Sequence, residues 1–307
     1  MGKKSKRSTK TGNEPDKKGA GKTRREKIAA LKDIDARITA LVENLEKEHE
    51  EKDVFAPISK REDCPICLVP MPAVDYSLKY ATRACFPCCS MQICKGCIFA
   101  QTQARVNLAC PFCRAPIKHS KNDGLKMVRQ RAEANDPEAL HDLAKSYAEE
   151  DDKCDVQQDC IAAMQLYLQA AELGNVASII DIAYKCRTGY AGKLGNAALA
   201  IRLATAIAKT GCMRGHALLG YLHFLDWNIE AEIPYDNDKK LKAIKHWAYA
   251  AKAGDPSSMK SLEQLCDDLE IYLEGCTLDE VKRDFDEAKK LEWTEERERA
   301  YAIDRMG

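Results

Sequence analysis

Clustered cysteines constrain this chain more than any other feature of its sequence. Nine of the 15 cysteines lie between residues 53 and 120 of a 307-residue chain. Three Cys-x2-Cys pairs have the spacing of zinc-binding knuckles, namely Cys64 with Cys67, Cys94 with Cys97, and Cys110 with Cys113. Cys85, Cys88 and Cys89 lie between the first and second pairs. These thiols are enough for two tetrahedral sites, so we expect two zinc ions as cofactors.

The rest of the sequence indicates a reducing compartment. The N-terminus shows no apolar core of a signal peptide, so we expect reduced cysteines and a cytoplasmic or nuclear location. Mean hydropathy is -0.46, and no apolar run approaches the roughly 20 residues that a bilayer span needs. We therefore expect no membrane partner.

The cysteine cluster resembles a RING-type zinc finger from residue 64 to residue 114. The motifs that carry this resemblance are Cys64-Pro65-Ile66-Cys67, Cys88-Cys89, Cys94-Lys95-Gly96-Cys97-Ile98-Phe99 and Cys110-Pro111-Phe112-Cys113-Arg114. In that family the two zinc sites interleave along the chain. The resemblance implies one zinc ion on Cys64, Cys67, Cys94 and Cys97, and a second on Cys88, Cys89, Cys110 and Cys113.

One ligand of the second site is open at this stage. Most RING fingers carry a histidine at the fourth ligand, whereas this chain offers only cysteines. Cys88 and Cys89 are adjacent and must turn sharply to share one ion, while Cys85 with Cys89 would allow a looser loop. We favour Cys88 with Cys89 and retain Cys85 as the alternative to Cys88.

The resemblance also implies a function. RING domains bind a ubiquitin-conjugating enzyme through a shallow apolar groove, and the matching positions here are Ile66, Ile98 and Pro111. Arg114 matches the position from which many active RING ligases bridge the conjugating enzyme and its ubiquitin, a role that suits a planar guanidinium. The chain is thus expected to be a ubiquitin-protein ligase that acts by positioning and needs no nucleophile. The alternative is a non-catalytic zinc-binding scaffold for protein contacts.

The N-terminal part of the chain is basic and then amphipathic. Residues 1–25 lack apolar periodicity, so we expect a disordered basic tail that could serve nuclear import, contact a nucleic acid or act only as a solubilising segment. Residues 26–52 predict an amphipathic helix with a narrow apolar seam. The seam consists of Leu31, Ile34, Ile38, Leu41 and Leu45. It would suit either dimerisation or packing on its own protein.

The C-terminal half reads as a helical repeat. Asn135, Gly174, Gly211 and Gly254 mark a period of 39, 37 and 43 residues, and small residues precede each glycine at matching offsets. Residues 127–270 resemble Sel-1-like repeats, which are related to tetratricopeptide repeats and imply stacked antiparallel helix pairs that bind protein segments. Such repeats would recruit a protein substrate here.

These observations predict a mainly α fold: a small zinc cross-brace RING domain at residues 60–118, followed by an α-solenoid of helix pairs. Within residues 135–266 we expect three helix pairs and a trailing helix. Residues 278–307 are acidic and helical in pattern, and we expect them to cap the end of the stack.

Overall fold

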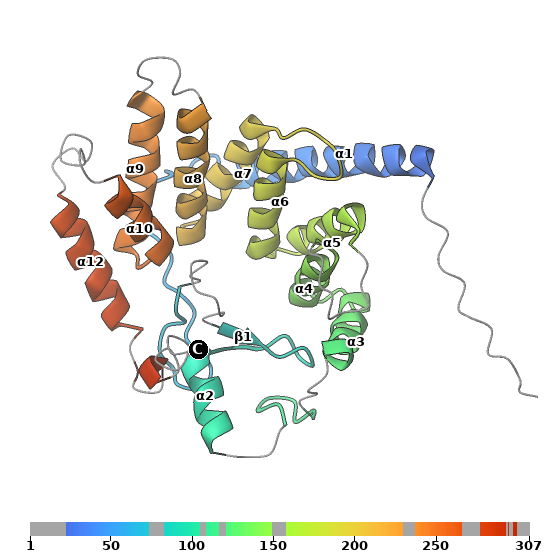
Figure 1. Cartoon of the computed structure of the whole chain (residues 1–307), viewed down its shortest axis with the longest axis horizontal. Helices are drawn as coiled ribbons and strands as arrows, with labels where there is room; N and C mark the ends of the chain where they lie inside the picture. The colour runs from blue at the N-terminus through green and yellow to red at the C-terminus, as the bar shows by residue number, and fades with distance from the viewer. Residues whose placement is uncertain are drawn as a thin grey trace, which may run out of the picture.

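The protein is mainly helical. The computed structural model describes residues 23–73, 83–104, 109–116, 121–148, 158–229, 237–265, 277–292, 294 and 297–299. Across these ranges the only paired strands are β1 (Arg83–Cys85) and β2 (Gln92–Cys94), which form a two-stranded antiparallel sheet (Figure 1). The predicted basic tail falls outside the described residues as far as residue 22.

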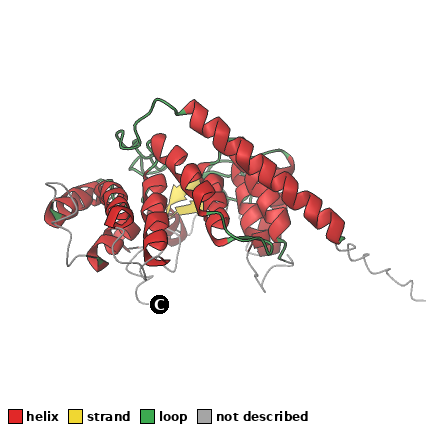
Figure 2. Cartoon of the chain, turned by 90° about the horizontal axis from the view of Figure 1, so that it is seen from above, coloured by secondary structure: helices red, strands yellow, loops and turns green. Residues whose placement is uncertain are grey.

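The N-terminal amphipathic helix is α1 (Arg24–Glu48), which begins and ends slightly before the predicted 26–52. It begins there because Thr23 and Glu26 form a capping box, in which each side chain accepts a hydrogen bond from the other residue's backbone N–H. Figure 2 shows α1 lying along the helical stack. Ile34 and Ile38 are fully buried against the stack. Of the two predicted alternatives, the helix therefore packs on its own chain.

A stack of consecutive antiparallel helices forms the rest of the core. Each of these helices packs against the next one along the chain. They are α3 (Lys121–Glu133), α4 (Pro137–Ala148), α5 (Cys160–Glu172), α6 (Val176–Thr188), α7 (Ala197–Lys209), α8 (Met213–Ile229), α9 (Asn237–Lys252) and α10 (Pro256–Gln264). The seven from α4 to α10 are the three pairs and trailing helix that the period predicts. Helix α3 begins before the predicted boundary at residue 127 and supplies a partner for α4.

The four repeat markers lie in equivalent turns. Asn135 separates α3 from α4, Gly174 separates α5 from α6, Gly211 separates α7 from α8, and Gly254 separates α9 from α10. Their φ angles are 58°, 87°, 79° and 92°, all in the left-handed region. Glycine adopts this conformation without strain and asparagine is among the residues that tolerate it best, so the period marks helix ends.

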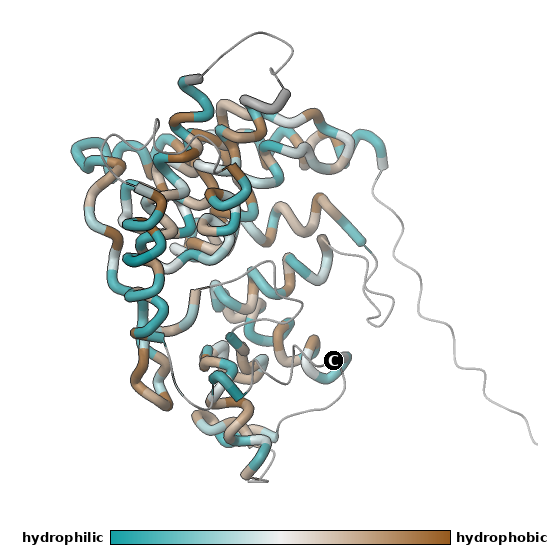
Figure 3. Tube along the Cα trace, turned by 60° about the vertical axis from the view of Figure 1, so that its left-hand side comes forward, coloured by the Kyte–Doolittle hydropathy of each residue, from teal (hydrophilic) through white to brown (hydrophobic). Residues whose placement is uncertain are grey.

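Small residues let neighbouring helices approach closely. The residues that precede the three glycines at matching offsets are all buried, namely Ala163, Tyr167, Ala170, Ala171, Ala200, Ala204, Ile207, Ala208, Ala243, Trp247, Ala250 and Ala251. At Gly220 a Cβ atom would collide with the indole of Trp247. Glu263, at the equivalent place in α10, is exposed. Apolar and polar stretches accordingly alternate along the helices in Figure 3.

The C-terminal helix α12 (Leu278–Lys290) packs against α9. A capping box of Thr277 and Glu280 starts it, and Val281 is its buried contact. The predicted helix over 278–307 is shorter in the structure, since α12 ends at Lys290 and a separate helical turn spans residues 297–299. Residues 300–307 lie outside the described ranges.

The cysteine-rich segment sits between the two ends of the stack. Its sheet and the helix α2 (Lys95–Gln103) lie below the arc of repeats, between α3 and α12 (Figure 1). At one end, Ser90 Oγ donates to Asp136 Oδ1 at 3.0 Å beside α4. Before the first knuckle, the Ser59 N–H donates to the Gly211 carbonyl oxygen at 2.8 Å. The marker turns thus contact this segment at both α3–α4 and α7–α8.

Candidate metal centre

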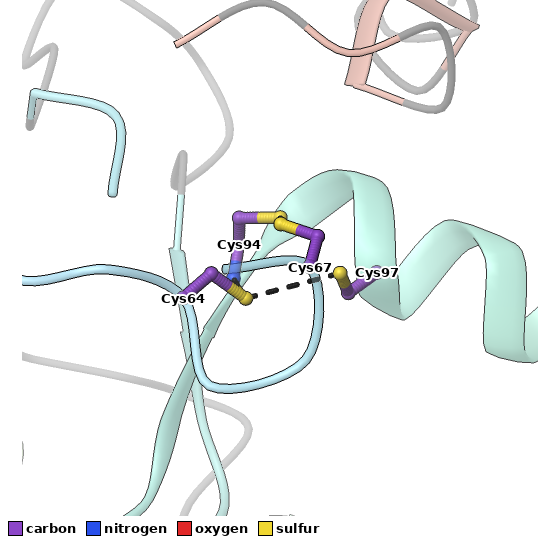
Figure 4. Close-up of side chains that lie close together, drawn as sticks. All are labelled: Cys64, Cys67, Cys94 and Cys97. Atoms are coloured by element: carbon purple, nitrogen blue, oxygen red, sulfur yellow. Dashed lines mark hydrogen bonds between the residues drawn. The ribbon is translucent and has the colours of Figure 1, made fainter. Parts of the chain in front are cut away.

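Four thiols from separate parts of the segment meet at one point. Cys64 and Cys67 lie on the first knuckle, Cys94 ends β2, and Cys97 lies in the first turn of α2 (Figure 4). The Sγ atoms of Cys64 and Cys97 are 3.8 Å apart, as are those of Cys67 and Cys94. All four sulfurs lie within 4.8 Å of one another. We call this group site 1.

A second group of four thiols forms in the same way. Cys88 and Cys89 come from the turn after β1, and Cys110 and Cys113 from the last knuckle. The Sγ atoms of Cys89 and Cys110 are 3.6 Å apart, and those of Cys88 and Cys113 are 3.4 Å apart. All four again lie within 4.8 Å of one another. We call this group site 2.

The donor set and its spacing fit zinc. Four sulfurs at about 2.3 Å from one zinc ion form a tetrahedron with edges of about 3.8 Å. The sulfur pairs Cys64–Cys97 and Cys67–Cys94 of site 1 have this separation, and the two pairs of site 2 are slightly closer. All-thiolate tetrahedral sites suit zinc better than harder cations such as magnesium or calcium. Both groups could therefore hold a metal ion, and their chemistry is consistent with zinc.

One turn is built three times around these sites. In each, a proline follows the first residue, and the fifth residue donates its N–H back to the first residue's carbonyl oxygen. The three donor–acceptor pairs are Leu68 to Cys64 at 2.8 Å, Ser90 to Phe86 at 2.8 Å, and Arg114 to Cys110 at 3.0 Å. Leu68, Ser90 and Arg114 all have left-handed φ angles, between 55° and 59°. The repeated turn places a thiol at the fourth position each time.

This turn brings Cys88, and not Cys85, next to the other thiols of site 2. Phe86 occupies the position that a cysteine holds in the other two turns, so Cys89 falls on the fourth position and Cys88 immediately before it. Both sulfurs then reach site 2. Cys85 lies outside either group, in β1 opposite Gln92. Burial and the nearby carboxylates of Asp142 and Glu138 raise the pKa of Cys85, an environment that suits a neutral thiol.

Backbone donors favour the thiolate form at one cysteine of each site. Burial alone would raise the pKa of Cys64, but the N–H groups of Cys94, Cys67 and Ile66 outweigh it and lower the pKa to about 7. The same balance lowers the pKa of Cys110 to about 7, mainly through the N–H groups of Cys113 and Phe112. Metal binding requires deprotonated thiols, so these donors assist it.

The residues expected to contact a conjugating enzyme or its ubiquitin differ in how far their side chains are exposed to solvent. Ile66 is 44% exposed, Pro111 and Arg114 are exposed, and Ile98 is half-buried against the cysteine core. Leu68, which the cysteine motifs did not single out, is 75% exposed in the first knuckle. In the sequence it stands directly after the second cysteine of the first knuckle, and that position is the signal that could have found it.

A second missed residue comes from the far end of the chain. Arg297 lies beside site 1, where its Nη2 atom is 3.5 Å from Cys67 Sγ. Burial opposes its charge, but the sulfurs of Cys94 and Cys67 together raise the pKa of Arg297. No local sequence pattern connects residue 297 to a knuckle more than two hundred residues earlier.

Similar proteins were found among solved structures. No protein-family model matches the sequence, and no curated protein matches it. Among solved structures, a Sel1 repeat protein from Oxalobacter formigenes is similar with 24% identity and a TM-score of 0.44, covering 64% of this chain and 71% of that one. A protective antigen present in uropathogenic Escherichia coli strains, with an SLR fold, has 20% identity and a TM-score of 0.43. The match covers 56% of this chain and 34% of the antigen.

None of the described helices is both long and apolar enough to cross a membrane.

Proposed function

We propose that this chain is a RING-type ubiquitin-protein ligase whose zinc-binding segment positions a ubiquitin-charged conjugating enzyme. The interleaved order of the thiols carries the proposal. The first and third cysteine pairs along the chain meet in site 1, and the second and fourth pairs meet in site 2. This cross-brace is the arrangement that the resemblance to RING fingers implies. Two independent zinc sites would instead group the first pair with the second and the third pair with the fourth.

Zinc would serve this segment as a structural cross-link. Eight cysteines would hold two ions, and each closed four-thiolate site leaves no position for a reacting water. The small apolar core around the sites contains Met71, Phe86 and Ile93, which is little for a segment of this length to fold on. Metal binding would therefore supply much of its folding free energy.

The exposed side chains around the knuckles provide the positioning surface. Ile66 and Leu68 project from the first knuckle and Pro111 from the last one, so both turns present apolar groups to a partner. Arg114 follows directly after a site 2 thiol, and its backbone is held by the bond to Cys110. Catalysis would consist of holding the ubiquitin thioester in a reactive arrangement near a substrate lysine.

The repeats would recruit the protein substrate. Helix α1 already covers α5 and α7, where Arg37 pairs with Glu172 and Arg202 with Glu46. The surface of α6 and α8 instead presents Tyr184, which is exposed and stacks on Tyr221 with ring centroids 6.2 Å apart. Aromatic side chains of this kind are common anchors for protein partners.

The test is a ubiquitin-discharge assay with the full chain and a broad panel of conjugating enzymes. A ligase will accelerate transfer of ubiquitin from at least one charged enzyme to free lysine, and chelation of zinc will abolish the acceleration. Protein that carries two zinc ions yet accelerates discharge from none of the panel would refute the ligase and leave a zinc-binding interaction scaffold.

A further inference from the structure

A buried guanidinium from the C-terminal segment lies against site 1. Arg297 is only 2% exposed. Its Nη1 atom donates to the carbonyl oxygens of Pro70 at 2.8 Å and Glu292 at 2.6 Å. Its Nη2 atom approaches Cys67 Sγ at 3.5 Å and Val69 O at 3.3 Å. The side chain therefore joins the first knuckle to the end of the chain.

The backbone of this segment also lies close to the second cysteine pair of site 1, Cys94 and Cys97. Gly96 lies between the site 1 residues Cys94 and Cys97, and a Cβ atom there would lie 2.6 Å from Arg297 Cγ and 2.7 Å from Arg297 N. Any residue larger than glycine would thus push the C-terminal segment away. Glu292 anchors the segment further by an ion pair with Arg61, which precedes the first knuckle.

The negative charge of a zinc–thiolate site would be stabilised by a guanidinium at this position. A zinc ion with four thiolates carries a net charge of −2, and burying such a charge is costly unless cations or donors lie nearby. Cys64 and Cys94 of site 1 are fully buried. Arg297 supplies a charge-assisted donor at that point.

Site 2 differs in this respect. Cys113 is exposed to solvent, so water can solvate its charge. Beside the Phe86–Ser90 turn, the guanidinium of Arg131 reaches the Cys88 carbonyl oxygen at 3.5 Å and the Ser90 hydroxyl at 3.0 Å. Arg131 thereby ties the turn to α3, and its hydrogen bonds go to oxygen atoms rather than to a sulfur.

We propose that Arg297 is a positioning residue of site 1, and that docking of the C-terminal residues Glu292 and Arg297 and retention of metal at Cys64, Cys67, Cys94 and Cys97 are one coupled event. This inference rests on the proposed zinc binding. The hydrogen bond stabilises the metal-bound thiolates, and the metal in turn holds the knuckle in the shape that the arginine fits. Outer groups of this kind change metal affinity by about 10- to 100-fold when removed.

The experiment measures the release of zinc to a chromogenic chelator from the full chain. Wild-type protein should release two zinc ions in two phases. Arg297→Gln should accelerate one phase by about 10- to 100-fold and leave the other unchanged, and Arg297→Lys should recover part of the loss because it keeps the charge. Arg283→Gln, an exposed arginine on α12, is the matched control and should behave as wild type.

Gly96→Ala provides a second variant that alters neither Arg297 nor a thiol. It should accelerate the same single phase, and helical circular dichroism should stay at the wild-type level because alanine suits a helix. In wild-type protein, partial chelation should also raise hydrogen exchange at residues 297–299 when the zinc ion leaves site 1. In cobalt-substituted protein, Arg297→Gln should shift the thiolate-to-cobalt absorption of one site.

The outcomes separate this inference from the proposal on which it rests. Two zinc ions in wild type with unchanged release from both Arg297→Gln and Gly96→Ala would overturn the coupling and leave zinc binding intact. Wild-type protein that binds no zinc would overturn both.

Discussion

The Nδ1 atoms of His216 and His246 lie 3.0 Å apart where α8 meets α9. Both rings are buried, and Phe55 stacks on His246 with ring centroids 5.0 Å apart. The hydroxyl of Tyr249 lies 2.6 Å from the Phe55 carbonyl oxygen, so the segment before the first knuckle is fastened to this pair. Only one proton fits between the two facing nitrogens, so the two rings cannot both be charged, and their burial lowers the pKa of each and favours the neutral pair.

Acid should destabilise the fold through this pair. Burial lowers the pKa of His216 to about 4, and burial with the neighbouring His216 and His223 lowers that of His246 to about 3. An unfolded histidine titrates near 6.5. The unfolded state thus binds more protons between these values, so the stabilisation is complete above pH 6.5 and is lost as the pH falls towards 4. We expect a loss of about 2 to 4 kcal/mol between pH 6.5 and 4.5.

His246→Phe is the control for that prediction. It keeps an aromatic ring beside Phe55 and removes one titrating group, so its unfolding free energy should fall less on acidification. The cysteine thiols titrate equally in both proteins and cancel in the comparison. His141, whose pKa is raised by Asp142 and Asp181 against the effect of burial, contributes in the opposite sense above pH 6.5. Equal pH slopes below 6.5, measured by denaturant unfolding, would contradict the role of the pair.

The repeat period was predictable because its physical cause is local. Each marker must end a helix in the left-handed region, so glycine or asparagine recurs there whatever the surroundings. The helix α3 was harder to identify, since its apolar face is limited to a few residues such as Leu125 and Val128 that pack only partly. Packing against α4 stabilises α3 more than the pattern of its own sequence does.

Two glycines should differ in how costly they are to replace. At Gly174 a Cβ atom would meet nothing within 4 Å, so Gly174→Ala should lower the unfolding free energy only by the cost of its φ of +87°, about 1 kcal/mol. At Gly211 the Cβ would also lie 2.7 Å from Ser59 Oγ and 3.1 Å from Pro57 O. Gly211→Ala should therefore cost about 2 kcal/mol or more. Urea unfolding followed by circular dichroism gives the order, and equal losses would show that the Ser59 contact is loose.

Helix α1 should stabilise the repeats rather than join two chains. Ile38 is buried against the stack, so Ile38→Ala should lower the unfolding free energy by about 2 to 4 kcal/mol. Ile28 lies on the same helix and is exposed, and Ile28→Ala should change it by less than about 0.5 kcal/mol. Sedimentation should give one mass for all three proteins. A dimer that Ile38→Ala dissociates without loss of stability would favour the other interpretation of the seam.

The sequence was enough to predict which eight cysteines group together, but not which other residues surround them. Knuckle spacing selects the ligand candidates because a Cys-x2-Cys turn brings two sulfurs together by local geometry alone. Whether the seam of α1 meets its own chain depends on α5 and α7, which lie more than a hundred residues away. Arg297 reaches Cys67 only once the whole stack has returned the C-terminus to the first knuckle, so only the fold reveals that contact.

Substitutions around the knuckles should affect two quantities separately, the affinity for a conjugating enzyme and the rate of ubiquitin discharge. Ile66 and Leu68 offer exposed apolar area in the first knuckle, and Ile66→Ala should weaken the affinity for a productive conjugating enzyme by about tenfold. Leu194→Ala removes an even more exposed apolar side chain from the loop between α6 and α7. That control should leave both affinity and discharge unchanged.

Arg114 should affect the second quantity alone. A group that only orders the reactive arrangement lowers the barrier without contributing to ground-state binding, so its loss changes turnover and not affinity. Arg114→Ala should bind the uncharged conjugating enzyme as wild type does and discharge ubiquitin about tenfold more slowly or worse. Arg114→Lys should recover little, because a lysine lacks the planar fork. If Arg114→Ala instead weakens binding and discharge by the same factor, the guanidinium is an ordinary contact with the enzyme and the positioning mechanism is wrong.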